Sequence, residues 1–106
     1  MRKTHITVVI TCTIQRDKIE MAIHALEENI KIVMEREPAC HGIQVHDDPK
    51  NPQRLLIIEH WESEDVFTGA HMRTPHMQAF FETSKEFLDG VADFSFWREV
   101  IATGKK

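Results

Sequence analysis

Seven histidines are the residues of this sequence best suited to move protons near neutral pH. His71 ends an expected short helix, near the expected cavity between helices and sheet, where a neutral imidazole could take a proton from a substrate hydroxyl. Alternatively, it caps the carbonyls of its own helix, and at a helix end it should add little to packing. His76 would bind a substrate oxygen or hold the loop 71–75. We therefore expect His71 to be a catalytic base and His76 to contact the substrate.

Four further side chains are candidates for substrate binding. Trp61 ends an expected strand and would either stack on an aromatic substrate or lie in the core. Glu59 shares a strand face with Trp61 and would orient a histidine or pair across a subunit interface, the structural role being the simpler one. Met77 and Phe80, with Phe81, follow helical spacing and either line an apolar pocket or form core.

The sequence lacks the usual motifs for metals and cofactors. His41/His46 and His71/His76 are each five residues apart, a spacing that splays side chains on a helix and puts them on opposite faces of a strand. Cys12 and Cys40 form no CxxC motif, and neither a glycine-rich phosphate loop nor a GxSxG elbow is present. We expect no metal ion and no cofactor.

Composition indicates one globular domain spanning residues 1–106. The net charge is −4 and the basic residues are scattered, which argues against a nucleic-acid partner. The apolar stretches are far shorter than the roughly 20 residues of a membrane span, so we expect no membrane contact. Two cysteines make no disulfide framework, and a cytoplasmic location is the default.

Hydrophobic periodicity predicts the first half of the fold. Alternation over 6–13 predicts a strand, and apolar residues at three-four spacing predict a helix over 17–36. Asp17 and Glu20 would form a capping box at its start, and Glu37-Pro38 would end it. Two strands, 41–47 and 54–61, then flank a turn rich in Asp, Pro and Asn, as in a hairpin.

The second half is expected to hold two helices and a last strand. Ser63 would cap a short helix through residue 71, and Thr74-Pro75 would start a second that stops near Gly90. A strand over 91–100 and a loose tail over 100–106 complete the chain. The order β-α-β-β-α-α-β predicts an α+β, ferredoxin-like split βαβ fold with an antiparallel sheet and helices on one face.

The strand 54–61 predicts a homodimer. Its centre is apolar to both sides, although helices on one face can cover only one of them. A second copy of the sheet is the simplest cover for the other. The alternatives are one small exposed patch or cover by the C-terminal tail.

Five short motifs in this order carry a family resemblance: Glu37-Pro38-x-Cys40, Asp48-Pro49 in the hairpin, Glu59-x-Trp61-Glu62, Ala70-His71, and Thr74-Pro75-His76-x-x-x-Phe80. Together they resemble the antibiotic-biosynthesis-monooxygenase family over about 44 residues. The resemblance implies a dimeric α+β barrel. It also implies oxygenation of quinols, anthrones or other electron-rich aromatics without metal, flavin or haem.

The sequence departs from that family pattern at several positions. Ala39 replaces the usual glycine, and Ile43 stands where an aromatic residue is common. The chain has no tyrosine, which excludes a mechanism through a tyrosine phenol. A haem-degrading branch of the family relies on an Asn, a Trp and a His. At the matching positions this sequence has a threonine-rich first strand, Ala70 and Phe80. We therefore expect no haem oxygenation.

Three functions remain open from the sequence. The first is a cofactor-independent monooxygenase acting on a small aromatic or quinol-like molecule. The second is an isomerase or decarboxylase on the same scaffold, with His71 as its acid and base. The third is a non-catalytic dimer that binds a small ligand or serves a stress response, because a fold does not fix a function.

Overall fold

The computed structural model describes residues 4–105, and its elements follow the predicted order. They are β1 (Ile6–Thr13), a 3-10 turn η1 (Arg16–Lys18), α1 (Ile19–Arg36), β2 (Cys40–Asp48), β3 (Asn51–Trp61), α2 (Glu64–Thr68), a 3-10 turn η2 (His71–Arg73), α3 (Pro75–Ser84) and β4 (Asp93–Trp97). Among the described helices, none is long and apolar enough to cross a membrane.

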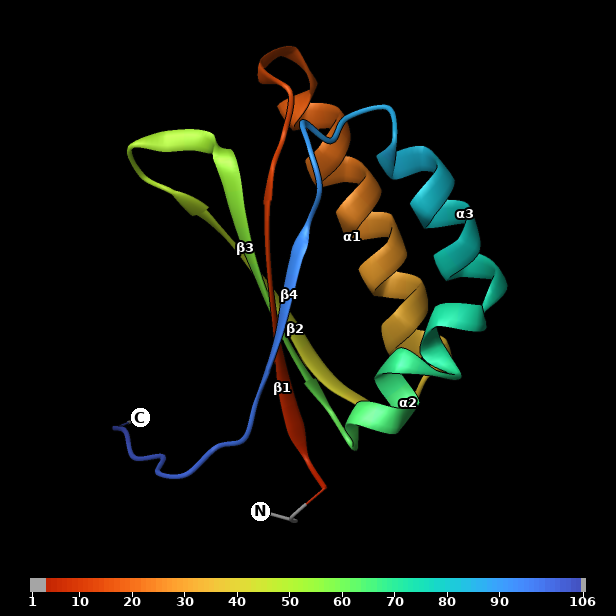
Figure 1. Cartoon of the computed structure of the whole chain (residues 1–106), viewed down its shortest axis with the longest axis vertical. Coiled ribbons are helices and arrows are strands. Elements are labelled where there is room, and N and C mark those ends of the chain that lie inside the picture. The colour runs from red at the N-terminus through yellow and green to blue at the C-terminus, as the bar shows by residue number, and fades with distance from the viewer. Residues whose placement is uncertain (1–3, 106) are drawn as a thin grey trace.

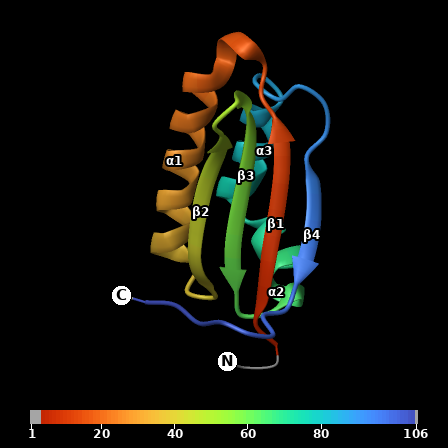
Figure 2. The same ribbon diagram turned by 90° about the vertical axis from the view of Figure 1, so that its left-hand side faces the viewer.

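The four strands form one antiparallel sheet in the order β2-β3-β1-β4. The helices lie on one face of this sheet (Figure 1), and its other face is bare (Figure 2). In the central pair, Val8 of β1 lies opposite Glu59 of β3. The predicted ferredoxin-like α+β fold is therefore confirmed.

The core lies between the sheet and α1. Most of its buried apolar side chains come from alternate positions of β1 and β3, from Ile14 just beyond β1 and from one stripe of α1: Val8, Ile10, Ile14, Ala22, Leu26, Val33, Leu55 and Ile57. Each large apolar side chain buried in this way stabilises the fold by about 1.5–3 kcal/mol before entropy is counted. The apolar side chains with helical spacing on α1 thus pack against the alternating apolar side chains of β1 and β3.

The start of the first helix differs from the prediction. Residues 16–18 form a 3-10 turn, and α1 begins at Ile19 with Lys18 as its N-cap and no side-chain cap bond. The predicted capping box of Asp17 and Glu20 is wrong, because Asp17 lies inside the turn rather than at the helix boundary.

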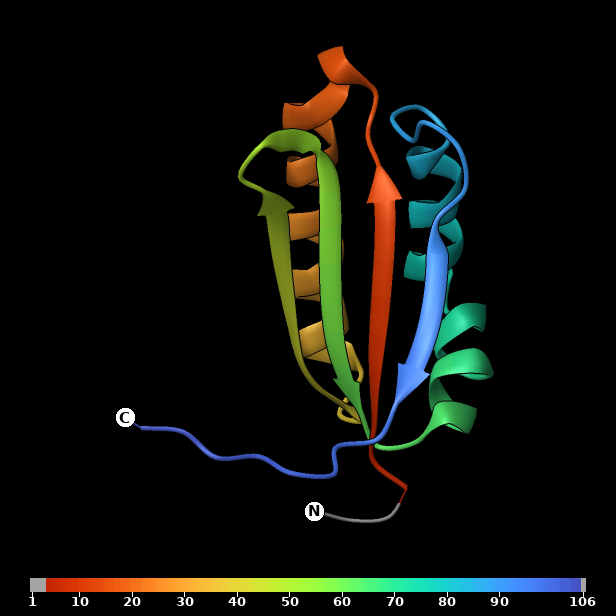
Figure 3. The ribbon, with the colours of Figure 1, turned by 60° about the vertical axis from the view of Figure 1, so that its left-hand side comes forward.

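The C-terminal elements are shorter than predicted. Helix α3 ends at Ser84 rather than near Gly90, and bends lead to Gly90, whose φ of 88° suits glycine. Strand β4 covers only Asp93–Trp97 instead of 91–100. The segment 98–105 forms neither helix nor strand (Figure 3).

The bare face of the sheet has an apolar centre. Val9 and Ile58 lie side by side across β1 and β3, Leu56 is next to them, and all three are half-buried. The tail does not cover this face, because Val100 and Ile101 are 88% and 85% exposed. The described residues of one chain thus leave the second apolar face of β3 without a cover.

Candidate functional site

A cavity of about 280 Å³ lies between the helices and the sheet. Most of its lining is apolar, and its lining side chains with polar groups are Cys12, Asn29, Glu59, His71 and Ser84. Two of the lining residues, Val91 and Phe94, are exposed, so the cavity reaches the surface beside the connection from α3 to β4. A small apolar ligand with a few polar atoms fits such a lining.

His71 lies in the wall of this cavity. It is the first residue of η2 and is only 2% exposed. Its ring lies 4.3 Å from the ring of Trp61 and 5.2 Å from that of Phe67, measured between centroids. The expectation that His71 adds little to packing is therefore wrong, since the ring is enclosed by aromatic side chains.

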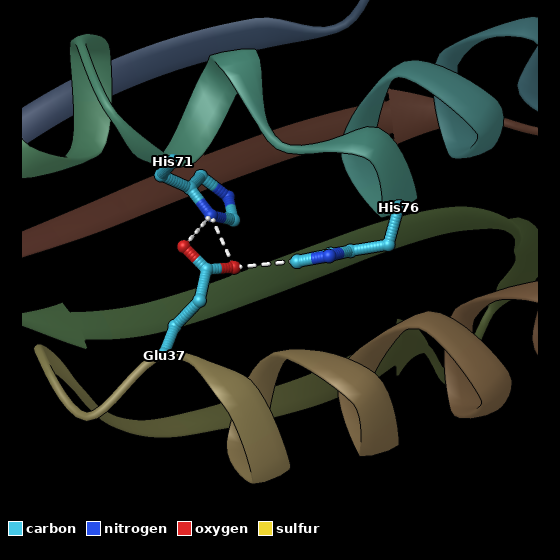
Figure 4. Close-up of side chains that lie close together, drawn as sticks. All are labelled: Glu37, His71 and His76. Carbon is cyan, nitrogen blue, oxygen red and sulfur yellow. Dashed lines mark hydrogen bonds and ion pairs between the residues drawn. The ribbon is translucent and has the colours of Figure 1, made fainter.

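The described hydrogen-bond partner of the His71 ring is Glu37, to which the sequence assigned no role in the site. Both carboxylate oxygens of Glu37 lie within hydrogen-bonding distance of His71 Nδ1, at 3.0 and 2.9 Å (Figure 4). One of them also accepts a hydrogen bond from His76 Nε2 at 2.7 Å. Glu37 thus joins the two histidines at the end of α1.

A bend between η2 and α3 brings the two histidines to one carboxylate. Thr74 caps α3 by accepting the Met77 amide, and it donates its hydroxyl to the His71 carbonyl at 2.8 Å. Pro75 then starts the helix. The expectation that His71 and His76 splay apart is wrong, because it assumed one continuous helix or strand.

Replacing Thr74 with alanine is expected to lower the free energy of unfolding by about 1 kcal/mol, the usual cost of losing an N-cap. Ser63→Ala is the matched control, since Ser63 caps α2 by accepting the Val66 amide. Denaturant titration should show similar losses for both variants. Only Thr74→Ala should shift the NMR signals of the His71 ring, and unchanged ring signals would contradict this account of the bend.

Glu59 and Trp61 form a second polar contact in the core. The Trp61 indole donates to Glu59 Oε1 at 2.8 Å, and both side chains are buried. Glu59 lines the cavity, whereas Trp61 does not and packs against the His71 ring in the core. Trp61 therefore supports both cavity-lining polar groups from the core side.

The structure divides the predicted site residues into two groups. His71, Glu59, Met77 and Phe80 line the cavity, and Trp61 and His76 do not. Glu37 is the residue that the sequence analysis missed, although it opens the first of the five motifs. Its contact with His71 joins residues 34 positions apart, which no local period could reveal.

Burial shifts the pKa values of three titratable groups of the cavity toward their uncharged forms. Burial lowers the pKa of His71 from 6.5, opposed by the hydrogen bond and charge of Glu37. Burial raises the pKa of Glu59, and the hydrogen bond from Trp61 only partly offsets this. Burial also raises the pKa of the Cys12 thiol. An uncharged ligand therefore suits this cavity better than an ion.

Among the described residues, Glu37, His71 and His76 are the group that could hold a metal ion, with ligand atoms within 4.8 Å of one another. Two imidazoles and a carboxylate are a ligand set that zinc accepts, at about 2.0–2.2 Å from the ion. The separations of 2.7 and 2.9 Å are those of direct N–H···O hydrogen bonds, however. In this arrangement hydrogen bonds, rather than a metal ion, connect the three side chains.

The chain is similar in sequence to a known family. The sequence model described as antibiotic biosynthesis monooxygenase matches residues 5–83, which include every element from β1 into α3. No curated protein matches the sequence.

Solved structures share the fold at low sequence identity. A conserved protein of Methanosarcina mazei is 23% identical, with a TM-score of 0.82 over 92% of this chain and 94% of its own. A protein of Nitrosomonas europaea, provisionally named an antibiotic biosynthesis monooxygenase, is 17% identical, with a TM-score of 0.85 over 98% of each chain. One of Bacteroides thetaiotaomicron with the same provisional name is 18% identical, with a TM-score of 0.85 over 98% and 97%.

Proposed function

The chain belongs to the antibiotic biosynthesis monooxygenase family, and on this premise we propose that it oxidises a small aromatic or quinol-like compound with O₂ and without a cofactor. His71 would act as the base. Glu59, Met77 and Phe80 would bind the substrate, and Trp61 and His76 would support the site from behind. The mostly apolar cavity of about 280 Å³ suits a molecule of one or two rings.

One observation carries this proposal: the second ring nitrogen of His71 is free. Nδ1 faces Glu37, while no described residue bonds Nε2. Among the described residues, every fully buried side-chain nitrogen or oxygen has a hydrogen-bond partner. Because Nε2 has none, it is not fully buried. Because His71 lines the cavity, its free nitrogen can accept a proton from a hydroxyl bound there.

The chemistry follows from that proton transfer. Nε2 takes the hydroxyl proton, and the resulting anion is electron-rich enough to pass an electron to O₂. The two radicals combine, the peroxide anion takes the proton back from Nε2, and the resulting hydroperoxide loses water to leave a new C=O group. A dihydroxynaphthalene and one O₂ thus give a hydroxynaphthoquinone and one water. All four electrons that reduce O₂ come from the substrate, so the balance needs no external reductant.

Oxygen uptake with 1,4-dihydroxynaphthalene as the probe tests the proposal. We expect saturable uptake of one O₂ per probe molecule, and labelled O₂ should leave one labelled atom in the product. Uptake should rise with pH through an ionisation below 6.5, because burial lowers the pKa of His71 and only the neutral ring is a base. Conversion to the plain quinone with release of hydrogen peroxide, at the rate without protein, would contradict the proposal.

Two copies are proposed to pair through the bare face of the sheet. The apolar centre formed by Val9, Leu56 and Ile58 supports this, because two such faces would cover each other. Ile57 and Glu59 line the cavity and alternate with Ile58 along β3, so they point to the opposite face and pairing does not cover them.

A further inference from the structure

We propose that Glu37 is a positioning residue that fixes the tautomer and orientation of His71, with His76 holding Glu37 in place. This inference rests on the proposed role of His71 as the base. It concerns a residue that does not line the cavity and reaches the reaction only through His71.

The tautomer follows from the hydrogen bonds. An ionised carboxylate can only accept hydrogen bonds, so Nδ1 must carry the proton where it faces Glu37 at 2.9 and 3.0 Å. The neutral ring then has its lone pair on Nε2, the nitrogen that does not face Glu37. Without Glu37 the ring could also carry its proton on Nε2, and that nitrogen could then accept no proton from the substrate.

The hydrogen bond from His76 holds the Glu37 carboxylate in place, and Glu37 in turn fixes the orientation of the His71 ring. His76 Nε2 holds one carboxylate oxygen at 2.7 Å, and the Thr74 hydroxyl lies 3.3 Å from the same nitrogen. The side chains of Glu37 and His76 are 12% and 7% exposed, so water competes little for these bonds. As Figure 4 shows, the carboxylate lies between rings that come from two different elements.

The charge of Glu37 acts on the intermediate. When Nε2 takes a proton, His71 becomes a buried cation, which burial disfavours and the adjacent carboxylate stabilises. The other titratable groups nearby are His76, whose charge lowers the pKa of His71, and Glu59 and Cys40, whose pKa values the charge of Glu37 raises. Glu37 is the group among these in direct contact with the His71 ring through a hydrogen bond.

The first test reads the tautomer without turnover. Nitrogen NMR of the ligand-free protein should show His71 protonated on Nδ1, and Glu37→Gln should lower the pKa of the ring, because the charge that raises it is gone. A proton on Nε2 in the wild type, or a metal ion bound to Nδ1, would overturn the inference.

The second test compares Glu37→Gln with Glu37→Asp in the oxygen-uptake assay. The glutamine amide can present its NH₂ group to Nδ1 and so favour the wrong tautomer, and we expect kcat/KM to fall by roughly 10²–10⁴-fold, as for other buried carboxylates behind a histidine base. The acidic limb of the pH profile should move to lower pH. Aspartate keeps the charge and should recover part of the rate.

The outcomes separate this inference from the proposed function. A Glu37→Gln variant that melts earlier but keeps its rate and its acidic limb would reduce Glu37 to a structural role and overturn the inference. Loss of the Nδ1 tautomer in that variant, in a protein that never consumes oxygen, would support the positioning role and contradict the proposed reaction.

Discussion

Replacing His71 with asparagine is expected to slow oxygen uptake by roughly 10²–10⁴-fold, the usual contribution of a positioned base. The asparagine amide can still donate a hydrogen bond toward Glu37, as Nδ1 does in the native ring. It offers nothing that can accept a proton on the cavity side. The variant therefore removes the base and keeps the polar contact behind it.

The loss of rate must be separated from a loss of stability. His71 is enclosed by Trp61 and Phe67, so the smaller side chain should lower the free energy of unfolding by about 1–3 kcal/mol. Leu55→Val is the matched control, because Leu55 is buried but does not line the cavity, and losing one methylene costs about 1 kcal/mol. The control should keep its rate.

A pH profile completes this comparison. The wild-type rate should rise with pH through the ionisation of His71, and the asparagine variant should lack that step. At high pH the variant should regain part of its rate, because more of the phenolic substrate then ionises unaided. Wild-type turnover by the variant would contradict the assignment of His71 as the base and move the search to solvent or Glu59.

The sequence predicted the order of the elements because each had a strong period of its own. The alternation over Ile6–Thr13 and the apolar stripe of α1 each repeat over many residues, so one residue that breaks the pattern does not obscure it. Helix and strand ends depend on single residues. Asp17 had the right spacing from Glu20 for a cap, but a 3-10 turn formed instead, and the chain after Ser84 turned before Gly90.

The candidate site was predicted only in part, for a related reason. Residue type alone pointed to His71, and strand spacing placed Glu59 and Trp61 on one face. The link between the histidines depends on contacts over 34 and 39 positions. It also depends on the bend at Thr74, where the helical spacing that separates His71 from His76 no longer applies. Tertiary contacts of this kind leave no period in a sequence.

Replacing Ile58 with aspartate is expected to raise the dissociation constant of the proposed dimer by more than roughly 10³-fold. Pairing through the bare face would bury one new carboxylate per subunit among apolar side chains, at several kcal/mol each, and 1.4 kcal/mol corresponds to a factor of ten. Within one subunit the change is mild, because Ile58 stays partly open to water on this face. Sedimentation equilibrium should show twice 12.4 kDa for the wild type and 12.4 kDa for the variant.

Met34→Asp is the matched control for this prediction. Met34 is an apolar residue of α1 that is 46% exposed, and α1 lies on the face of the sheet opposite the bare one. The Met34→Asp variant should leave the dimer intact, because the proposed pairing does not cover Met34. On β3, Ile58 and Glu59 point to opposite faces, so the Ile58 variant changes the pairing surface without altering a cavity side chain. A wild-type monomer at micromolar concentration, or a dimer that survives the Ile58→Asp substitution unchanged, would contradict pairing through this face.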